Sequence, residues 1–362
     1  TLIFCASRRP VTFSERAHRE IRCGITAGRR LGTERIESML KGAIVVLAHK
    51  RTDHLRACLD AISRAARRED FLMAVVVDEG NRTVHDLLTS AQPNVTIRLE
   101  PEDGSPARAR ILRSLKHGLS WAFDVAGVDY AIVIEDDIVV SEDFFVFVEA
   151  CFERYRNRPL FRAVNGFGLG HPSAEVRENE VEVTRLSYGV GWGWAIPKKS
   201  YDKVLPLLKL RGDYHVWDAL IEPYLRTGYV VNPRASKIRN IGFDLTATHT
   251  KLDVDAAFGA ELEASFLSGA PAQAATMTII ESAMGFRWRT DAIALDALPL
   301  PKRLLTFGVG FLLWRVHRRK LNLQEKGFRS GMLDSLSLTI RKQALPALGR
   351  RSGSSEPSPQ PS

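Results

Sequence analysis

Four short runs of apolar residues dominate the first 135 positions of the chain. They cover residues 43–47, 73–77, 95–99 and 130–134, and all are rich in Val and Ile. None alternates cleanly between apolar and polar residues, which is typical of strands buried on both faces of a parallel sheet. The pattern therefore predicts four central strands.

The segments between these runs have helical periodicity. After Thr52, apolar residues recur at Leu55, Leu59 and Ile62, a spacing that places them on one face of a helix. Comparable patterns cover residues 107–126, 143–155, 198–208 and 215–226. Strands that alternate with helices imply right-handed crossovers and a sheet covered on both faces, so the predicted fold class is α/β.

Open α/β sheets bind ligands at the carboxyl ends of their strands. Arg51 follows the first predicted strand, Asp78 follows the second, and Glu135, Asp136 and Asp137 follow the fourth. Three adjacent carboxylates repel one another, and a hard divalent cation such as Mg²⁺ or Mn²⁺ would relieve that repulsion. The alternative is a solvated loop before a capped helix, which Ser141 explains well but which leaves the acids at the strand end unexplained. We therefore expect a metal site.

Other side chains suit a phosphorylated sugar ligand, and each also has a purely structural interpretation. Asp78 can accept hydrogen bonds from a ribose or base, or can be a turn residue. Arg51 and Arg113 suit phosphate, or belong to a solvated basic face. Trp192 and Trp194, in a glycine-rich segment, can stack on sugar rings or pack in the core.

Two acids and one histidine later in the chain are candidates for proton transfer or metal binding. Asp218 follows Trp217 on a predicted helix and can act as a general base, and Glu222 one turn later competes for that role. His249 can ligate the metal, although a lone histidine is more often structural.

Composition adds limits on the kind of partner. The chain has 362 residues and a net charge of +9, which favours an anionic partner such as nucleic acid, an acidic membrane or a phosphorylated substrate, or serves solubility alone. The four cysteines form no Cys-x-x-Cys pair, which fits a reducing compartment. Residues 1–40 lack the apolar core of a signal peptide. We expect a cytoplasmic protein.

From about residue 43 to 250, the ordered series of motifs resembles the GT-A fold glycosyltransferases, in particular N-acetylglucosaminyltransferase I and related bacterial enzymes of the family-2 type. The matching segments are Val-Val-Leu-Ala-His-Lys-Arg at 45–51, Val-Val-Asp-Glu-Gly at 76–80, Ile-Glu-Asp-Asp-Ile at 134–138, Gly-Trp-Gly-Trp-Ala at 191–195 and Asn-Ile-Gly-Phe-Asp at 240–244.

The resemblance implies a GT-A domain, Rossmann-like, with a metal ion on Asp137. It places Glu135 and Asp136 near the ribose and donor sugar, and gives Arg51 and Asp78 contacts with the nucleotide. The eukaryotic relatives carry two acids after the tryptophan, whereas this chain has Trp-Asp-Ala-Leu at 217–220, so the base falls on Asp218.

The predicted organisation has four parts: an N-terminal extension at 1–41, a GT-A domain at 42–250, a helical extension at 251–349 and a disordered tail at 350–362. Within the extension, residues 304–314 are apolar and a basic stretch follows. That run is too short to cross a bilayer but suits an interfacial helix, or an ordinary core helix with a basic end. Peripheral membrane association therefore remains open.

The expected function is metal-dependent, inverting transfer of a sugar from a nucleotide-diphosphate donor, a UDP-sugar, to a glycan or lipid-linked glycan. One alternative is a sugar nucleotidyltransferase, although these usually need an early glycine-rich phosphate loop and residues 47–51 contain no glycine. The other is a non-catalytic module that binds nucleic acid or membrane. We expect no nucleic-acid partner.

Overall fold

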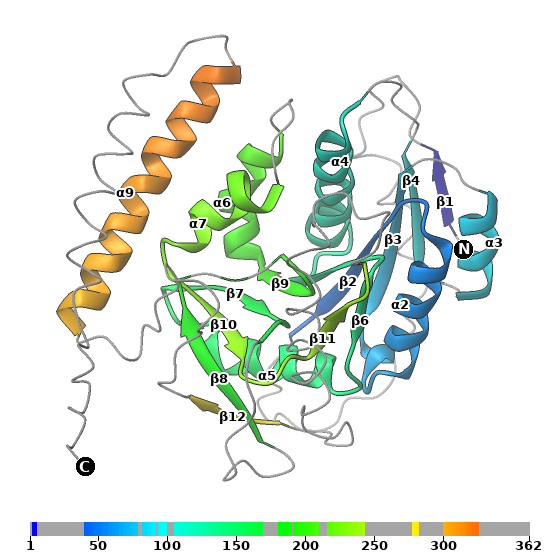
Figure 1. Ribbon diagram of the computed structural model, residues 1–362, viewed down its shortest axis with the longest axis horizontal. Helices are drawn as coiled ribbons and strands as arrows, with labels where there is room; N and C mark the ends of the chain where they lie inside the picture. Colours follow the sequence, from blue (N-terminus) through cyan, green and yellow to red (C-terminus); the bar gives the residue numbers. More distant parts are fainter. Residues whose placement is uncertain are drawn as a thin grey trace, which may run out of the picture.

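A computed structural model of the chain describes residues 2–5, 40–78, 82–91, 93–99, 105–168, 180–187, 189, 191–209, 216–242, 277–281 and 300–325. In this part of the chain a mostly parallel sheet of ten strands is flanked by helices (Figure 1). This arrangement confirms the predicted α/β, Rossmann-like fold class. The predicted His249 ligand and the tail at 350–362 lie outside the described residues.

The four predicted central strands are confirmed, each to within one residue at its ends. They are β2 (Gly42–Ala48), β3 (Leu72–Asp78), β4 (Val95–Leu99) and β5 (Tyr130–Glu135). The other strands are β1 (Leu2–Cys5), β6 (Ile138–Val140), β7 (Phe161–Asn165), β8 (Glu180–Leu186), β9 (Trp194–Pro197), β10 (Tyr229–Pro233), β11 (Ile238–Asn240) and β12 (Thr278–Glu281).

The predicted helices are also present. They are α2 (Thr52–Arg64), α4 (Ala107–Ser120), α5 (Phe144–Tyr155), α6 (Lys198–Leu208) and α7 (Glu222–Leu225). Two of the predicted helices contain a π-helical part, η3 (Trp121–Val125) after α4 and η4 (Val216–Ile221) before α7. The structure adds α3 (Arg82–Ala91) and the short η2 (Arg68–Asp70). The helix expected around 304–314 is present as the longer α9 (Leu300–Glu325).

The strand order is β1-β4-β3-β2-β5-β9-β7-β10-β8-β12. From β2 the chain first moves outward to β3 and β4, and then returns to the other side of β2 to form β5, parallel to it. The direction of winding therefore reverses between β2 and β5. In sheets of this kind, ligands bind outside the carboxyl ends of the strands at that reversal.

Both faces of the central strands are buried, which explains why their sequences do not alternate with polar residues. In β2, Ile44 and Val46 belong to one hydrophobic cluster, while Ala43 and Val45 belong to another on the opposite face. Helices α2, α3 and α5 pack on the first face, and α4, α6 and α7 pack on the second. The contact of α4 with the sheet is close, since a Cβ on Gly118 would lie 2.3 Å from Val45 Cγ1.

A two-stranded ribbon of β6 and β11 lies beside the carboxyl end of β5 (Figure 1). The ribbon is held at its base by Lys237 and Asp143, whose side chains are fully buried and form an ion pair of 2.5 Å between Nζ and Oδ2. Ser141 also donates its hydroxyl to Asp143 over 2.6 Å. The ribbon therefore fixes residues 136–137 and 240–242 relative to each other.

Three elements lie outside the range predicted for the main domain, 42–250. Strands β1 and β12 extend the sheet at its two ends. Helix α9 packs on α7, where Trp314 and Tyr224 form an edge-to-face ring pair with centroids 5.5 Å apart. Strands β1 and β12 thus belong to the same sheet as the predicted main domain. The predicted domain boundaries stay a prediction.

Candidate active site

A cavity of about 180 Å³ opens at the carboxyl ends of β2, β3 and β5, where the winding of the sheet reverses. One wall is a face of α4 formed by Ala107, Arg110, Ile111 and Ser114, which recur at helical spacing. The opposite wall contains Asn240 and Gly242 at the end of β11, together with Trp192. Six predicted site residues line the cavity: Arg51, Asp78, Glu135, Asp136, Asp137 and Trp192.

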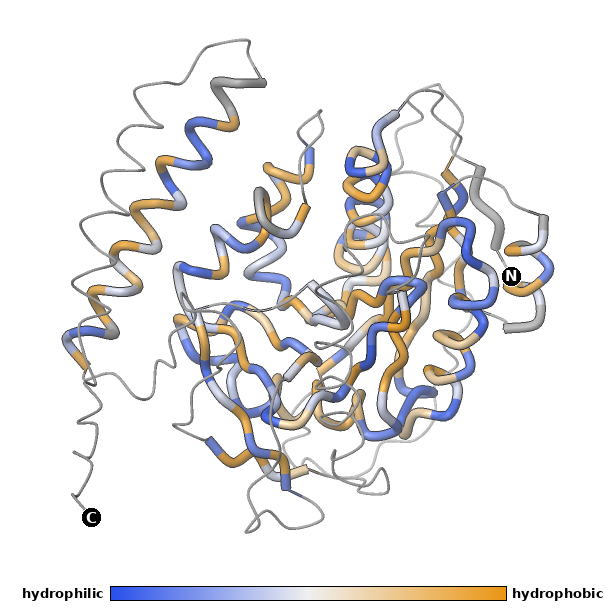
Figure 2. The backbone as a smooth tube through the Cα atoms, viewed as in Figure 1, coloured by the Kyte–Doolittle hydropathy of each residue, from blue (hydrophilic) through white to orange (hydrophobic). Residues whose placement is uncertain are grey.

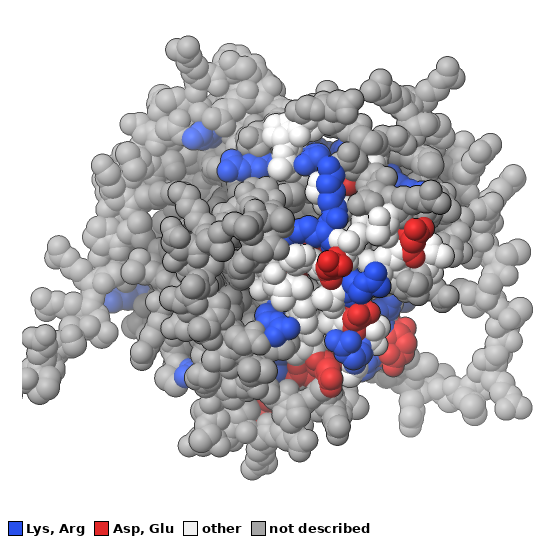
Figure 3. All heavy atoms as spheres, turned by 45° about the vertical axis from the view of Figure 1, so that its right-hand side comes forward, with Lys and Arg blue, Asp and Glu red and all other residues white. Residues whose placement is uncertain are grey.

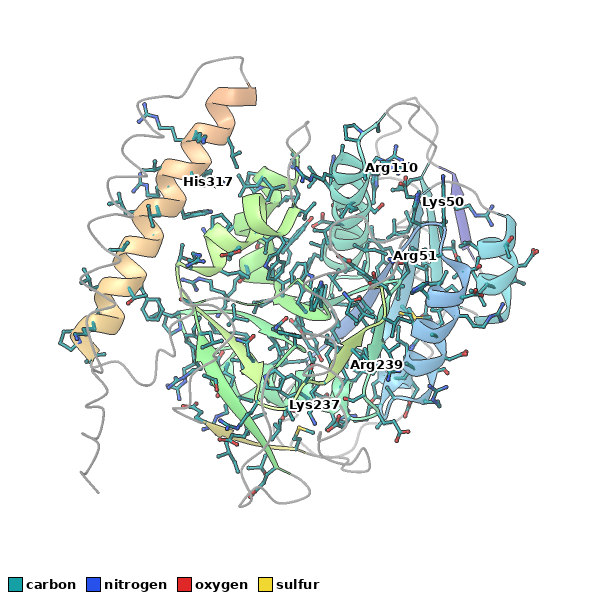
Figure 4. All side chains as sticks on the ribbon, in the orientation of Figure 1. Lys50, Arg51, Arg110, Lys237, Arg239 and His317 are labelled. Atoms are coloured by element: carbon teal, nitrogen blue, oxygen red, sulfur yellow. The ribbon has the colours of Figure 1, made fainter. Side chains whose placement is uncertain are left out.

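Arg51 bridges two of the three adjacent acids. Its Nη2 lies 2.6 Å from Asp136 Oδ1 and 2.7 Å from Asp137 Oδ2. The other oxygen of Asp136 accepts a hydrogen bond of 3.2 Å from the backbone N–H of His49. The arginine after β2 and the acids after β5 are 85 residues apart, and the parallel pairing of the two strands brings them together. Figure 4 shows Arg51 at this edge of the sheet, with Arg110 near the start of α4.

The electrostatics of this cluster oppose full ionisation of its acids. Burial, and then the charges of Asp137 and Asp136, raise the pKa of Glu135 to about 8. Burial also raises the pKa of Asp136, although Arg51 opposes that shift. Burial alone would lower the pKa of Arg51, but the carboxylates of Asp137 and Asp136 outweigh burial and raise it. The acids therefore form a site where added positive charge is stabilising.

Asp137 has one carboxylate oxygen to spare. Its Oδ2 accepts from Arg51, whereas its Oδ1 is buried and has no hydrogen-bond partner within the described part of the chain. Buried carboxylate oxygens normally have a partner, and an orphaned one in a cavity lined by two further acids fits a cation ligand. This feature matches the metal role that the resemblance implies for Asp137.

The described residues contain no group of three or more His, Cys, Asp or Glu side chains that would hold a metal by themselves. That does not conflict with Mg²⁺ or Mn²⁺, because such ions are often held by one or two carboxylates and by substrate phosphates. Asp137 is thus suited to a metal that arrives with a diphosphate.

Asp78 is held by basic side chains at the cavity wall. Arg113 Nη2 lies 2.7 Å from its Oδ1, and Arg110 Nε lies 3.6 Å from its Oδ2. His49 contacts both the carbonyl of Asp78, at 3.0 Å, and its carboxylate, at 3.7 Å. Arg113 was predicted to contact phosphate, but in the structure it holds Asp78 and does not line the cavity. Figure 3 shows basic and acidic side chains side by side on the face that it presents.

Gly242 forms part of the wall because no larger residue fits there. A Cβ at this position would lie 2.1 Å from Asp137 Oδ2 and 2.9 Å from Arg51 Nη1. The Asn240 side chain accepts from the Gly242 N–H over 2.7 Å, and the Ile241 N–H donates to the carbonyl of Asp137 over 2.8 Å. The backbone after β11 is therefore packed directly against the acids.

The two tryptophans predicted to stack on a sugar occupy different environments. Trp192 lines the cavity and contacts Phe167 edge to face. Trp194 is 3% exposed and packs edge to face on Trp217 with centroids 5.3 Å apart. Gly193 between them has a positive φ of 54°, which breaks the strand alternation. Trp194 is thus a core residue, and Trp192 keeps its predicted place at the site.

The two predicted candidates for the base differ in what the structure says of them. Glu222 is buried, makes two contacts of 3.0 and 2.6 Å with Arg226, and does not line the cavity. Asp218 lies in η4, and its side chain is not among those that the structure describes. The role of Asp218 as the base therefore stays a prediction.

Sequence patterns alone missed several residues of the cavity. His49 and Arg110 line it, although neither was among the predicted site residues. The signal for the α4 wall was present in the spacing of Ala107, Arg110, Ile111 and Ser114. Asn240 and Gly242 belong to the segment 240–244 that carries the resemblance, but their place in the cavity depends on the pairing of two three-residue strands.

Comparison with protein-family models and with curated proteins finds no match. Among solved structures, one match is S. aureus TarS 1–349, at 11% identity and a TM-score of 0.38, over 86% of this chain and 89% of that one. Another is a cytidylyltransferase from Leptospira borgpetersenii serovar Hardjo-bovis, at 11% identity and a TM-score of 0.29, over 47% of this chain and 63% of that one. Similarities this weak do not bear on the function of the chain.

Proposed function

We propose that this chain is a glycosyltransferase that moves a sugar from a UDP-sugar to a hydroxyl group of a glycan or lipid-linked glycan. The observation that carries the proposal is the buried, unpartnered Oδ1 of Asp137, in a cavity at the strand ends beside Arg51 and two further acids. A site built from carboxylates and arginines suits a ligand that brings both a divalent cation and phosphates.

In this proposal each wall of the cavity has its own task. Asp137 would hold Mg²⁺ or Mn²⁺, which would offset the charge of the diphosphate. Arg51, released from the acids, faces the phosphates, and Asp78, held in place by Arg113, accepts hydrogen bonds from the nucleoside. Trp192 offers an aromatic surface to a sugar ring.

The proposed reaction is a single displacement with inversion. The acceptor hydroxyl attacks the anomeric carbon, its proton passes to the carboxylate of Asp218, and the diphosphate leaves with the electrons of the broken bond. The base sits in η4, whose Val216 and Leu220 pack in the same hydrophobic cluster as α4. That packing fixes η4 next to the helix that forms one cavity wall.

The test incubates the protein with each of a panel of UDP- and GDP-sugars and Mn²⁺. The quantity measured is the release of nucleoside diphosphate. The proposal expects slow release of UDP from one sugar even without an acceptor, and expects EDTA and Asp137→Asn to abolish it. Asp60→Asn is the matched control, because Asp60 is an exposed acid on α2 away from the cavity. Turnover that survives both EDTA and Asp137→Asn would refute the proposed role of the site.

The same assay separates the proposal from a nucleotidyltransferase. That class would consume a nucleoside triphosphate with a sugar phosphate and release pyrophosphate, whereas the proposed reaction releases UDP. Pyrophosphate formation in place of UDP release would assign the cavity to the alternative. Tight nucleic-acid binding, unchanged in Asp137→Asn and without turnover of any nucleotide sugar, would favour a binding module.

A further inference from the structure

Helix α9 carries an apolar face that the rest of the described chain does not cover. Seven large hydrophobic side chains are exposed in the described residues, and five of them lie on this one helix. They are Leu300, Leu304, Leu305, Phe311 and Leu312, with exposed fractions from 47% to 66%. Isolated exposed apolar residues need no explanation, but a concentration on one element indicates an interaction surface.

The same helix packs on the protein through a neighbouring stripe of its surface. Phe307, Trp314 and Leu321 recur every seven residues and are 9%, 6% and 3% exposed. Gly310 lies in the same contact, where a Cβ would be 2.0 Å from the carbonyl oxygen of Arg226. The packed stripe therefore holds α9 on the protein, while Leu304 and Phe311 beside it stay exposed. In Figure 2, hydrophobic positions recur along the helix at the edge of the molecule.

The charge of α9 indicates what covers the exposed face. The helix has one acidic residue, Glu325 at its last position, whereas Arg315, Arg318, Arg319 and Lys320 follow the apolar part. Arg315 lies on the same side of the helix as Leu304 and Phe311, because Phe311 follows Leu304 by seven positions and Arg315 follows Phe311 by four. Apolar residues followed by exposed cations on one face are the pattern of helices that lie at an anionic lipid surface.

Helix α9 cannot act as a membrane span, because no helix in the described residues is long and apolar enough to cross a bilayer. A second copy of the chain is a less suitable partner, since a two-fold contact would bring two identical cationic faces together. His317 marks α9 on the opposite side of Figure 4 from Lys50 and Arg51, so membrane contact there leaves the cavity accessible.

We propose that the exposed face of α9 docks on the surface of an anionic lipid bilayer, with Leu304 and Phe311 inserted among the acyl chains and Arg315 and Arg319 near the headgroups. This proposal does not depend on the enzymatic function of the cavity. It holds equally if the cavity proves to have another substrate.

The test is co-sedimentation of the full chain with vesicles of phosphatidylcholine alone or with 30% phosphatidylglycerol added. The protein binds the anionic vesicles and not the neutral ones, and raising the salt from about 50 to 500 mM weakens binding at least fivefold. Leu304→Gln with Phe311→Gln weakens binding at least tenfold. Arg315→Gln with Arg319→Gln weakens it by about 10- to 30-fold.

Matched controls change comparable side chains on elements other than α9. Leu72→Gln with Val125→Gln removes exposed apolar side chains from other elements, and Arg56→Gln with Arg64→Gln removes the same charge from α2. Both controls bind like the unaltered protein, and all variants keep its circular dichroism spectrum and melting temperature.

Three results would overturn the proposal. The first is no binding to anionic vesicles at low salt. The second is binding that the α9 variants and their controls weaken equally. The third is a dimer in light scattering that Leu304→Gln with Phe311→Gln converts to monomer, with no vesicle binding, which would assign the face to a second copy of the chain.

Discussion

The buried ion pair at the base of the β6–β11 ribbon gives the most quantitative prediction from this structure. Lys237 and Asp143 have side-chain exposures of 1% and 0% and a separation of 2.5 Å. Replacing Lys237 with Met leaves the Asp143 carboxylate buried with only the Ser141 hydroxyl as a side-chain donor. Removing one partner of such a pair costs about 3–5 kcal/mol, a large share of the stability of a typical domain.

The assay is urea unfolding followed by circular dichroism, with two comparison variants. In Lys237→Met with Asp143→Leu both charges are absent, so the double variant is more stable than Lys237→Met alone by about 2 kcal/mol. Lys198→Met removes one partner of the half-exposed Lys198–Asp202 pair and costs less than about 1 kcal/mol. A loss in Lys237→Met no larger than that in Lys198→Met would refute the reasoning.

Three further predictions concern the cavity. Arg51→Gln removes the cation that competes for Asp136 and Asp137, so titration of the nucleotide-free protein gives a Mn²⁺ affinity at least tenfold higher, about 1.4 kcal/mol; unchanged or weaker Mn²⁺ binding would contradict this. The pKa of Glu135 is raised from 4.5 to about 8 in the folded protein. Between these two pH values the unfolded chain loses this proton while the folded chain keeps it, so the free energy of unfolding of the metal-free protein falls as the pH rises, by up to about 5 kcal/mol in total. Urea midpoints in EDTA check it, and Glu135→Gln flattens the profile; a flat profile in the unaltered protein would contradict it. Gly242→Ala places a methyl group 2.1 Å from Asp137 Oδ2, and lowers UDP affinity at least tenfold by calorimetry, whereas Gly308→Ala, in open space on α9, leaves that affinity unchanged.

Much of the fold was predictable because its signals are local. The runs at β2, β3 and β5 are apolar on both faces, so their composition alone indicates buried parallel strands. The helix predicted over 198–208 coincides with α6. The later strands, β7 to β10, were not predicted, since their order and direction depend on pairing partners distant in sequence.

The candidate site likewise has residues that local sequence signals predict and contacts that only the folded chain shows. Asp78, Asp136 and Asp137 were found because each follows a strand with a strong local signal. The bridge from Arg51 to two acids was not foreseen, because it depends on how side chains share charge across the ends of β2 and β5. The sequence left sugar stacking and core packing open for both Trp192 and Trp194. The positive φ of Gly193 directs them to different environments, and sequence periodicity does not report a backbone angle.

The measurement that tests the central claim most directly is calorimetric titration of UDP into the protein with and without Mn²⁺. If Asp137 and the diphosphate share one cation, Mn²⁺ strengthens UDP binding at least tenfold in the unaltered protein and in Asp60→Asn, and has no effect in Asp137→Asn. UDP binding that is equally tight in EDTA and in Asp137→Asn, or no UDP binding under any of these conditions, would contradict the account.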